Sequence, residues 1–308
     1  MHRDKDISTE LTLRIGDRTV ELLFGEGSGP LPFYRSLYRE FLMDCCQTAG
    51  RLKIFFLPAT CEALFGEPEG REIFNDVIFT REKLNGWIVE NAGWTGESFL
   101  TEKAFGVQSS NGLLIYMPET GSARVYLPQN DREPFKSLYR LFWIYFAQVI
   151  GEKGACFLHA ASIARGGKGY LFIGGTGTGK STLARYSNNG RVLSDEAPVV
   201  SGGPEGLRAY PSPYHQLGPE HHFGSDLISS GVEVKALCFL VMSEETFVQT
   251  VSRVDAIAMI MTRHIHFLYC LTPEARAKLF DLFHRACHTL PVYCLHYAIN
   301  TDIWKVMP

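Results

Sequence analysis

One eight-residue segment constrains this chain more than any other. Residues 174–181 read Gly-Gly-Thr-Gly-Thr-Gly-Lys-Ser, a full match to the pattern G-x-x-x-x-G-K-[S/T]. An apolar stretch at 170–173 predicts a strand before it, and residues 180–188 predict a helix after it. A glycine-rich loop between a strand and a helix can turn its backbone N–H groups toward phosphate oxygens. The alternative is a glycine-rich turn with an exposed lysine.

In a phosphate-binding loop of this kind, the last residues have defined tasks. Lys180 would reach the β- and γ-phosphates of a nucleotide, and the Ser181 hydroxyl would ligate Mg²⁺. ATP and Mg²⁺ are therefore the expected cofactors. The expected nucleotide-binding residues are Gly174, Gly175, Thr176, Gly177, Thr178, Gly179, Lys180, Ser181 and Thr182.

Two adjacent carboxylates and one histidine are further candidates near this loop. Asp195 and Glu196 follow a short predicted strand. One of them could hold Mg²⁺ while the other accepts a proton from a nucleophile, although an ordinary acidic turn would look the same. His159 lies in an apolar stretch before the loop strand, where it could be catalytic or simply a core histidine.

The residue patterns divide the chain into two predicted domains. Its 308 residues already favour two. Residues 1–132 alternate polar and apolar positions between turn residues and predict a β-rich N-terminal domain with one helix. Residues 133–308 mix strands and helices around the loop, beginning with an apolar helix that opens at Pro134 and ends at Gly151. The expected fold class is α/β, or α+β overall.

The individual expected elements follow from the same patterns. The expected strands are 11–15, 20–24, 52–57, 73–79, 87–89, 113–117, 125–127, 156–163, 170–173, 191–194, 198–200, 207–210, 234–242 and 292–299. The expected helices are 33–45, 134–151, 180–188, 254–262 and 273–289.

Composition argues against several other classes of protein. Lys and Arg total 30 and Asp and Glu total 33, so no general excess of positive charge favours nucleic acid or an anionic membrane. The polar start and the absence of an apolar run near the ~20 residues of a membrane helix favour a cytoplasmic protein that does not insert into membranes. The eight cysteines form no C-x-x-C pair and are interpreted as reduced core thiols.

Other histidines and cysteines allow a metal interpretation. No C-x-x-C or H-E-x-x-H pattern supports it, so ordinary packing is the favoured interpretation. The residues concerned are His215, His221 and His222, and separately His284, Cys287, His288, Cys294 and His296.

Three segments around the loop resemble the HPr kinase/phosphorylase family: residues 158–163, 169–183 and 190–196. The chain looks especially like the shorter HPr-kinase-like proteins found near peptide-modification genes, including precursor-peptide kinases of lasso-peptide clusters. These proteins belong with the phosphoenolpyruvate carboxykinase-like P-loop enzymes. The resemblance implies that residues 133–308 form such a P-loop domain with a mixed sheet, and it implies homo-oligomers because HPr kinases form hexamers.

The resemblance also implies roles for single residues. Asp195 matches the family's general base toward the acceptor hydroxyl, and His159 matches the histidine that supports it. Glu196 occupies the position of a second aspartate. The predicted catalytic residues are thus Asp195, His159 and Lys180, and the predicted metal ligands are Ser181, Asp195 and Glu196.

The expected function is an ATP- and Mg²⁺-dependent kinase. It would transfer the γ-phosphoryl group to a hydroxyl, with a serine of a protein or peptide as the expected acceptor. Two alternatives stay open at this point. One is a nucleotide-binding sensor or scaffold without catalysis, and the other is a kinase that acts on a small metabolite.

Overall fold

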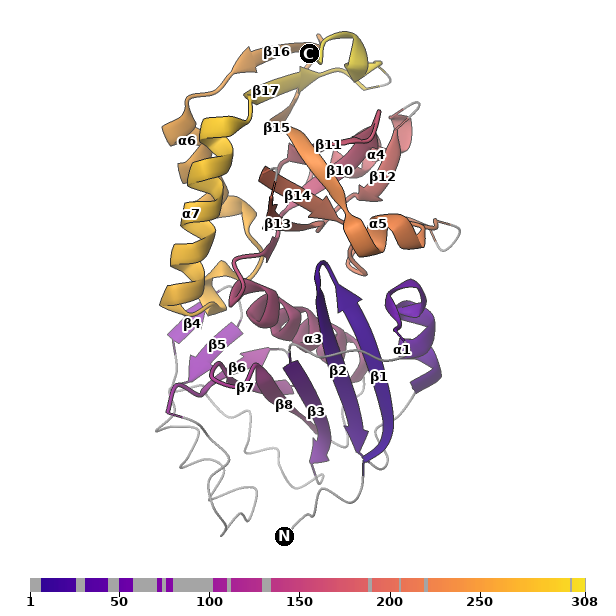
Figure 1. Ribbon diagram of the computed structural model, residues 1–308, viewed down its shortest axis with the longest axis vertical. Coiled ribbons are helices and arrows are strands. Elements are labelled where there is room, and N and C mark those ends of the chain that lie inside the picture. Colours follow the sequence, from indigo (N-terminus) through magenta and orange to yellow (C-terminus); the bar gives the residue numbers. More distant parts are fainter. Residues whose placement is uncertain are drawn as a thin grey trace. The chain divides into compact units, whose positions relative to one another are not determined.

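The computed structural model describes most of the chain, in two compact units (Figure 1). One unit comprises Met1–Arg14 and Arg18–Val149, and the other comprises Ile15–Asp17 and Ile150–Pro308. Each unit is treated by itself below. The described residues are 7–25, 31–43, 50–57, 71–73, 76–79, 102–109, 112–128, 134–187, 190–204, 206–218, 221–299 and 301–307.

The first unit is built on a mixed sheet. Within its described residues the strand order is β1-β2-β3-β8-β7-β6-β5-β4. The pairs β2–β3 and β3–β8 are parallel, and the pairs from β8 to β4 are antiparallel. The strands are β1 (Ile7–Ile15), β2 (Arg18–Gly25), β3 (Gly50–Leu57), β4 (Arg71–Ile73), β5 (Asp76–Phe79), β6 (Phe105–Ser109), β7 (Gly112–Met117) and β8 (Ser122–Pro128).

Two helices give this unit an aromatic core. They are α1 (Leu31–Leu37) and α3 (Pro134–Gly151), and the predicted bounds of α3 are confirmed. Every residue of α3 from Ile144 to Ile150 is buried, so this half of the helix is covered around its whole circumference rather than on one face. The ring of Phe142 lies 5.4 Å from that of Tyr34, and Phe146 meets Tyr38 edge-on at 6.2 Å.

The second unit is also a mixed sheet with helices, which confirms the α+β expectation for the described part of the chain. Its main path runs β12-β10-β11-β15-β14-β13-β9, and β17 pairs with both β15 and β16. The strands are β9 (Cys156–Phe157), β10 (Ala160–Arg165), β11 (Lys168–Ile173), β12 (Arg191–Ser194), β13 (Val199–Gly203), β14 (Gly206–Tyr210), β15 (Val232–Met242), β16 (Phe247–Thr250) and β17 (Val292–Tyr297).

Helices lie beside the strands of this sheet (Figure 1). On one face, Leu183 and Ala184 pack against Phe172 and Cys238 in a shared core. The parallel strands β11, β15 and β17 lie at the centre of that core, as the long apolar run of β15 predicts. The helices are α4 (Lys180–Tyr186), α5 (Ser225–Ser230), α6 (Arg253–Met259) and α7 (Pro273–Thr289), with a π turn at Ile260–His264 and 3-10 turns at Leu268–Cys270 and Ile303–Lys305.

One predicted strand of this unit is wrong in a way that matters for the site. The expected strand 156–163 is divided into β9 and β10, because the chain changes partners between them. Phe157 pairs with Val199 of β13, whereas β10 pairs with β11 and β12. His159 lies in the gap, and its backbone N–H donates to the His264 carbonyl at 2.7 Å.

The remaining differences from expectation are smaller. The expected helix 33–45 is shorter and continues as a 3-10 turn at Arg39–Phe41, and the expected strand 73–79 is the two strands β4 and β5. The elements β6, β16 and α5 were not expected. The expected strand 87–89 lies outside the described residues.

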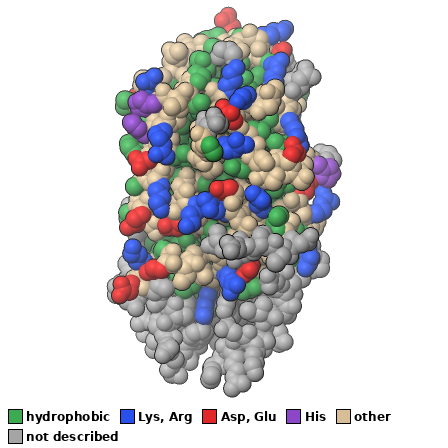
Figure 2. All heavy atoms as spheres, in the orientation of Figure 1, with side chains coloured by type: hydrophobic (Ala, Val, Ile, Leu, Met, Phe, Trp, Pro, Cys, Tyr) green, Lys and Arg blue, Asp and Glu red, His purple; other side chains and the backbone are tan. Residues whose placement is uncertain are grey.

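Two surface observations bear on the expected partners. None of the helices in the described part of the chain is both long and apolar enough to cross a membrane. On the face drawn in Figure 2, Lys and Arg side chains are interspersed with Asp and Glu.

Candidate functional site

The glycine-rich segment forms the connection between β11 and α4. The Thr178 hydroxyl donates to the Gly175 carbonyl at 2.8 Å, and the Thr178 N–H approaches the same oxygen at 3.3 Å, so the segment closes as a tight turn. Gly177 and Gly179 have φ values of 83° and 84°, in the left-handed region that favours glycine. A Cβ atom on Gly175 or Gly177 would meet nothing within 4 Å. Open space therefore lies beside the turn.

The other predicted nucleotide-binding residues flank this turn. The Gly174 N–H donates to the His159 carbonyl at 3.2 Å, which ties the start of the loop to the gap between β9 and β10. Thr176 is exposed, and Ser181 and Thr182 are half-buried in the first turn of α4. All of the predicted loop residues thus belong to one continuous β–loop–α segment.

A tyrosine that the sequence did not suggest fixes the end of the loop. The hydroxyl of Tyr297, on β17, lies 2.9 Å from the Gly179 carbonyl oxygen and 3.3 Å from that of Thr178. A Cβ atom at Gly179 would collide with this hydroxyl. Because 118 residues separate Tyr297 from Gly179, no local sequence signal connects them.

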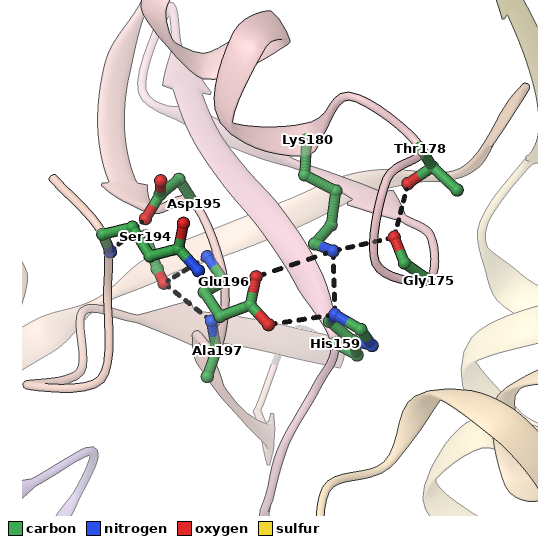
Figure 3. Close-up of polar contacts among 9 residues, drawn as sticks. His159, Gly175, Thr178, Lys180, Ser194, Asp195, Glu196 and Ala197 are labelled. Carbon is green, nitrogen blue, oxygen red and sulfur yellow. Dashed lines mark hydrogen bonds and ion pairs between the residues drawn. The ribbon is translucent and has the colours of Figure 1, made fainter. Parts of the chain in front are cut away.

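The side chain of Lys180 points inward from the loop (Figure 3). It is only 4% exposed. Its Nζ lies 3.1 Å from the Gly175 carbonyl, 2.8 Å from Nε2 of His159 and 3.6 Å from Oε2 of Glu196. Burial lowers the pKa of Lys180, and the negative charge of Glu196 opposes that shift. The ammonium is therefore held against a carboxylate and an imidazole.

The two neighbouring carboxylates point in different directions (Figure 3). Glu196 faces Lys180 and His159, with Oε1 3.0 Å from Nε2 of the histidine. Asp195 is 1% exposed and its Oδ1 accepts the backbone N–H of Gln216 at 2.8 Å. The Ser194 hydroxyl accepts the N–H groups after it, from Glu196 and Ala197, and so shapes the turn that separates the carboxylates.

The charges around Glu196 decide its protonation state. Burial acts to raise the pKa of Glu196, but the hydrogen bond with His159 and the charge of Lys180 outweigh burial. The pKa of Glu196 therefore lies below its ordinary value. At neutral pH this side chain is a carboxylate that can accept hydrogen bonds or ligate a cation.

Two further histidines that the sequence did not suggest lie at this site. Leu158 and Ile265 form an isolated β-bridge, which brings His264 and His266 to the gap where His159 lies. The rings of His159 and His266 are 4.9 Å apart. One ligand atom each from His159, Glu196 and His266 lies within 4.8 Å of the others. Within the described residues, these are the side chains placed to share a metal ion, and the set differs from the predicted Ser181, Asp195 and Glu196.

Burial keeps the two new histidines neutral. It lowers the pKa of His266 to about 3 and that of His264 to about 4, and the nearby His159 and Lys180 act in the same direction. An unfolded histidine has a pKa near ~6.5. Below that pH these two histidines bind protons in the unfolded chain but stay neutral in the folded chain. Folding stability should therefore fall as the pH drops from ~6.5 toward the folded pKa values.

Replacing His266 with glutamine tests this pH dependence. One fewer proton is then taken up on unfolding, so the slope of the unfolding free energy against pH should decrease by about 1.4 kcal/mol per pH unit between pH 6 and 4.5. Urea unfolding at several pH values measures the slope. H288Q makes the same substitution at an exposed histidine of α7 and is the matched control for the change of side chain. An unchanged slope in H266Q would contradict the assignment.

Comparison with known proteins gives one family. Its model, described as SynChlorMet cassette protein ScmC, matches residues 133–308. No curated protein matches the chain. The match includes all three segments that resembled HPr kinase/phosphorylase and places them in a different family, so that assignment is wrong. Since the match spans more than half of the 308 residues, the chain belongs to the ScmC family of SynChlorMet cassette proteins.

Proposed function

We propose that this chain is an ATP- and Mg²⁺-dependent kinase that transfers a phosphoryl group to a hydroxyl, with a serine of a protein or peptide as the expected acceptor. One observation carries the proposal. The lysine of a full G-x-x-x-x-G-K-[S/T] loop is buried with its ammonium against His159 and Glu196. Groups that bind phosphate thus lie beside groups that can take up a proton, which is what phosphoryl transfer to a hydroxyl needs.

The loop residues fit the phosphates of a nucleotide. Space is open beside Gly175 and Gly177, so phosphate oxygens could approach the backbone there. Lys180 would hold the β- and γ-phosphates, and Ser181 with one of the two carboxylates would hold Mg²⁺. Bound ATP would supply the phosphoryl group, and Mg²⁺ would neutralise its charge.

His159 couples the lysine to the carboxylate. Its Nε2 lies 2.8 Å from Nζ of Lys180 and 3.0 Å from Oε1 of Glu196. A ring nitrogen can accept a hydrogen bond from the ammonium or donate one to the carboxylate, but it cannot do both at once. If Lys180 turns to a phosphate, His159 and Glu196 remain as a pair that can accept the proton of a hydroxyl.

The proton acceptor is then one of two adjacent residues. The residue pattern alone leaves both open, because the role of Asp195 came from the resemblance that the family match overturned. The contacts favour Glu196 because it touches His159 and Lys180, whereas Asp195 is buried against Gln216. Both assignments are predictions, and they differ in which single substitution stops the reaction.

Parallel variants D195N and E196Q test the function and the acceptor together. Each chain is incubated with γ-labelled ATP, Mg²⁺ and an array of serine-containing peptides, and nucleotide binding is measured separately. Loss of a general base should lower transfer by about 10²- to 10⁴-fold while binding stays near the original value. We expect E196Q to lose transfer while it still binds the nucleotide. If only D195N lost transfer in this way, Asp195 would be the proton acceptor.

Two outcomes would overturn parts of the proposal. Transfer at the original rate by both variants would exclude both carboxylates as the proton acceptor. Binding of ATP without transfer to any peptide would overturn the proposal of a peptide kinase. Small metabolites that carry a hydroxyl group are then added. Label on a metabolite would indicate a metabolite kinase, and no label would indicate a nucleotide sensor.

A further inference from the structure

A cavity lies at the other end of β11 from the loop. It has a volume of about 400 Å³ and is called here the Trp304 pocket. Since β11 runs from Lys168 to Ile173 and the loop begins directly after it, the two ends are roughly 17 Å apart at about 3.3 Å per residue. The lining residues are Arg165, Gly166, Lys168, Tyr170, Lys235, Trp304 and Met307.

The fold builds this pocket from three separate segments. Gly166 and Gly167 make a two-residue turn with φ values of 58° and 76°, which sets Arg165 directly opposite Lys168. A register shift between β11 and β15 falls just after Gly169, opposite the stretch of β15 that contains Lys235.

An aromatic pair forms the wall of the pocket. Trp304 comes from the 3-10 turn Ile303–Lys305, and its ring meets Tyr170 edge-on at 5.0 Å. Ile303, which is 4% exposed, anchors this turn in the core shared with α4. The wall is therefore fixed by packing on the sheet.

The pocket carries more positive than negative charge. The guanidinium of Arg165 lies over the Trp304 ring, 4.7 Å from its centroid. Lys168 is paired with Glu233. Among the described residues, neither Arg165 nor Lys235 has a carboxylate within ion-pair distance. Within that part of the chain, two cations therefore line the cavity without a paired carboxylate.

The cations share the cavity with an aromatic ring. Arg165 and Lys235 offer N–H groups at a cavity whose wall includes Trp304 and Tyr170. A ligand that carries a carboxylate next to an apolar group matches both features of this lining.

We infer that the Trp304 pocket binds an acidic segment of the peptide or protein acceptor. A carboxylate of the segment pairs with Arg165 and Lys235, and an adjacent apolar side chain packs on Trp304 and Met307. The inference rests on the proposed function for the identity of its ligand. About six extended residues would reach from this pocket to the loop, so docking here would raise the local concentration of the acceptor hydroxyl.

Labelled peptides test the pocket without nucleotide. The probes are fluorescein-labelled twelve-residue peptides that carry Glu-Phe-Asp at varied positions, and matched peptides that carry Gln-Phe-Asn. Fluorescence anisotropy with the full chain measures binding. We expect the acidic peptides to bind at least about tenfold more tightly than the amide peptides, because charge-assisted hydrogen bonds are the stronger ones. Added salt should weaken this binding.

Matched variants locate the binding on the chain. R165Q and K235Q should each weaken the binding of the acidic peptides about five- to tenfold. R276Q and K153Q make the same charge changes at exposed residues elsewhere in this unit and should stay within about twofold of the original. Thermal melting confirms that each variant is folded.

Three results would overturn the inference. The first is that acidic and amide peptides bind equally well. The second is that R165Q and K235Q bind the acidic peptides as tightly as the control variants do. The third is that an equal concentration of inorganic phosphate displaces the peptide, which would indicate a general anion site. The proposed kinase fails separately. A chain that binds acidic peptides at Arg165 and Lys235 but transfers no label would overturn the kinase and leave the pocket standing.

Discussion

Replacing Lys180 with methionine should abolish phosphoryl transfer while leaving the chain folded. Methionine keeps most of the length of the side chain and removes the ammonium, so the buried position is filled without a charge. The loop then lacks its one buried cation for phosphate oxygens, and losses of about 10²- to 10³-fold in rate are typical when one such group is removed. ATP should also bind more weakly.

Stability is the second part of this prediction. Burial lowers the pKa of Lys180, which shows that the protein pays a desolvation cost for the ammonium. The unfolding free energy of K180M should therefore stay within about 1 kcal/mol of the original, since the lost contact with Glu196 and the recovered desolvation oppose each other. K153M, at an exposed site, is the control. Transfer by K180M above a tenth of the original rate would contradict the role of Lys180.

Replacing Gly179 with alanine should destabilise the chain and disable the loop. Two effects add at this position: a φ of 84° strains any residue with a Cβ, and that Cβ would collide with the Tyr297 hydroxyl. The matched control is G177A, because Gly177 has a φ of 83° but nothing within 4 Å of a Cβ. G177A should cost about 1–2 kcal/mol from backbone strain alone.

The difference in unfolding free energy between G179A and G177A measures the cost of the collision with the Tyr297 hydroxyl. We expect G179A to cost about 1–3 kcal/mol more than G177A in urea unfolding, in the range of other overpacking substitutions, and to lose nucleotide binding. Removing the hydroxyl in G179A/Y297F should recover part of that difference. Equal costs for G177A and G179A would show that Tyr297 does not hold the loop.

Local signals account for what the sequence predicted well. Pro134 and Gly151 mark the ends of α3, and the glycine-rich motif with its apolar flank places β11, the loop and α4. These features depend on backbone preferences of neighbouring residues, so a sequence pattern suffices to find them. The likeness to HPr kinases depended on residues near the same motif, and the ScmC family model matches these residues too.

The rest of the site depends on pairings between distant segments. The apolar pattern at 156–163 predicts one strand, but the chain exchanges β13 for β11 and β12 on the two sides of His159, and Leu158 forms a bridge with Ile265 in between. The same bridge brings His266 to the site. No neighbouring residue signals either event, because the partners lie far away in the chain.

The orientation of the carboxylates could not be predicted for a similar reason. Asp195 and Glu196 are adjacent and chemically alike, so the sequence offers no basis for choosing between them beyond the resemblance. Their separation depends on the Ser194 hydroxyl and on the backbone N–H of Gln216, which comes from a later loop.

The hydrogen bonds of Tyr297 have a consequence for the order in which the chain is synthesised. The ribosome releases residues 174–179 well before β17, the strand that carries the tyrosine. Until that strand has emerged and paired with β15, the carbonyl groups of Thr178 and Gly179 lack the hydroxyl that holds them. A growing chain therefore exposes its glycine-rich motif early but completes the motif's geometry only near the end of translation.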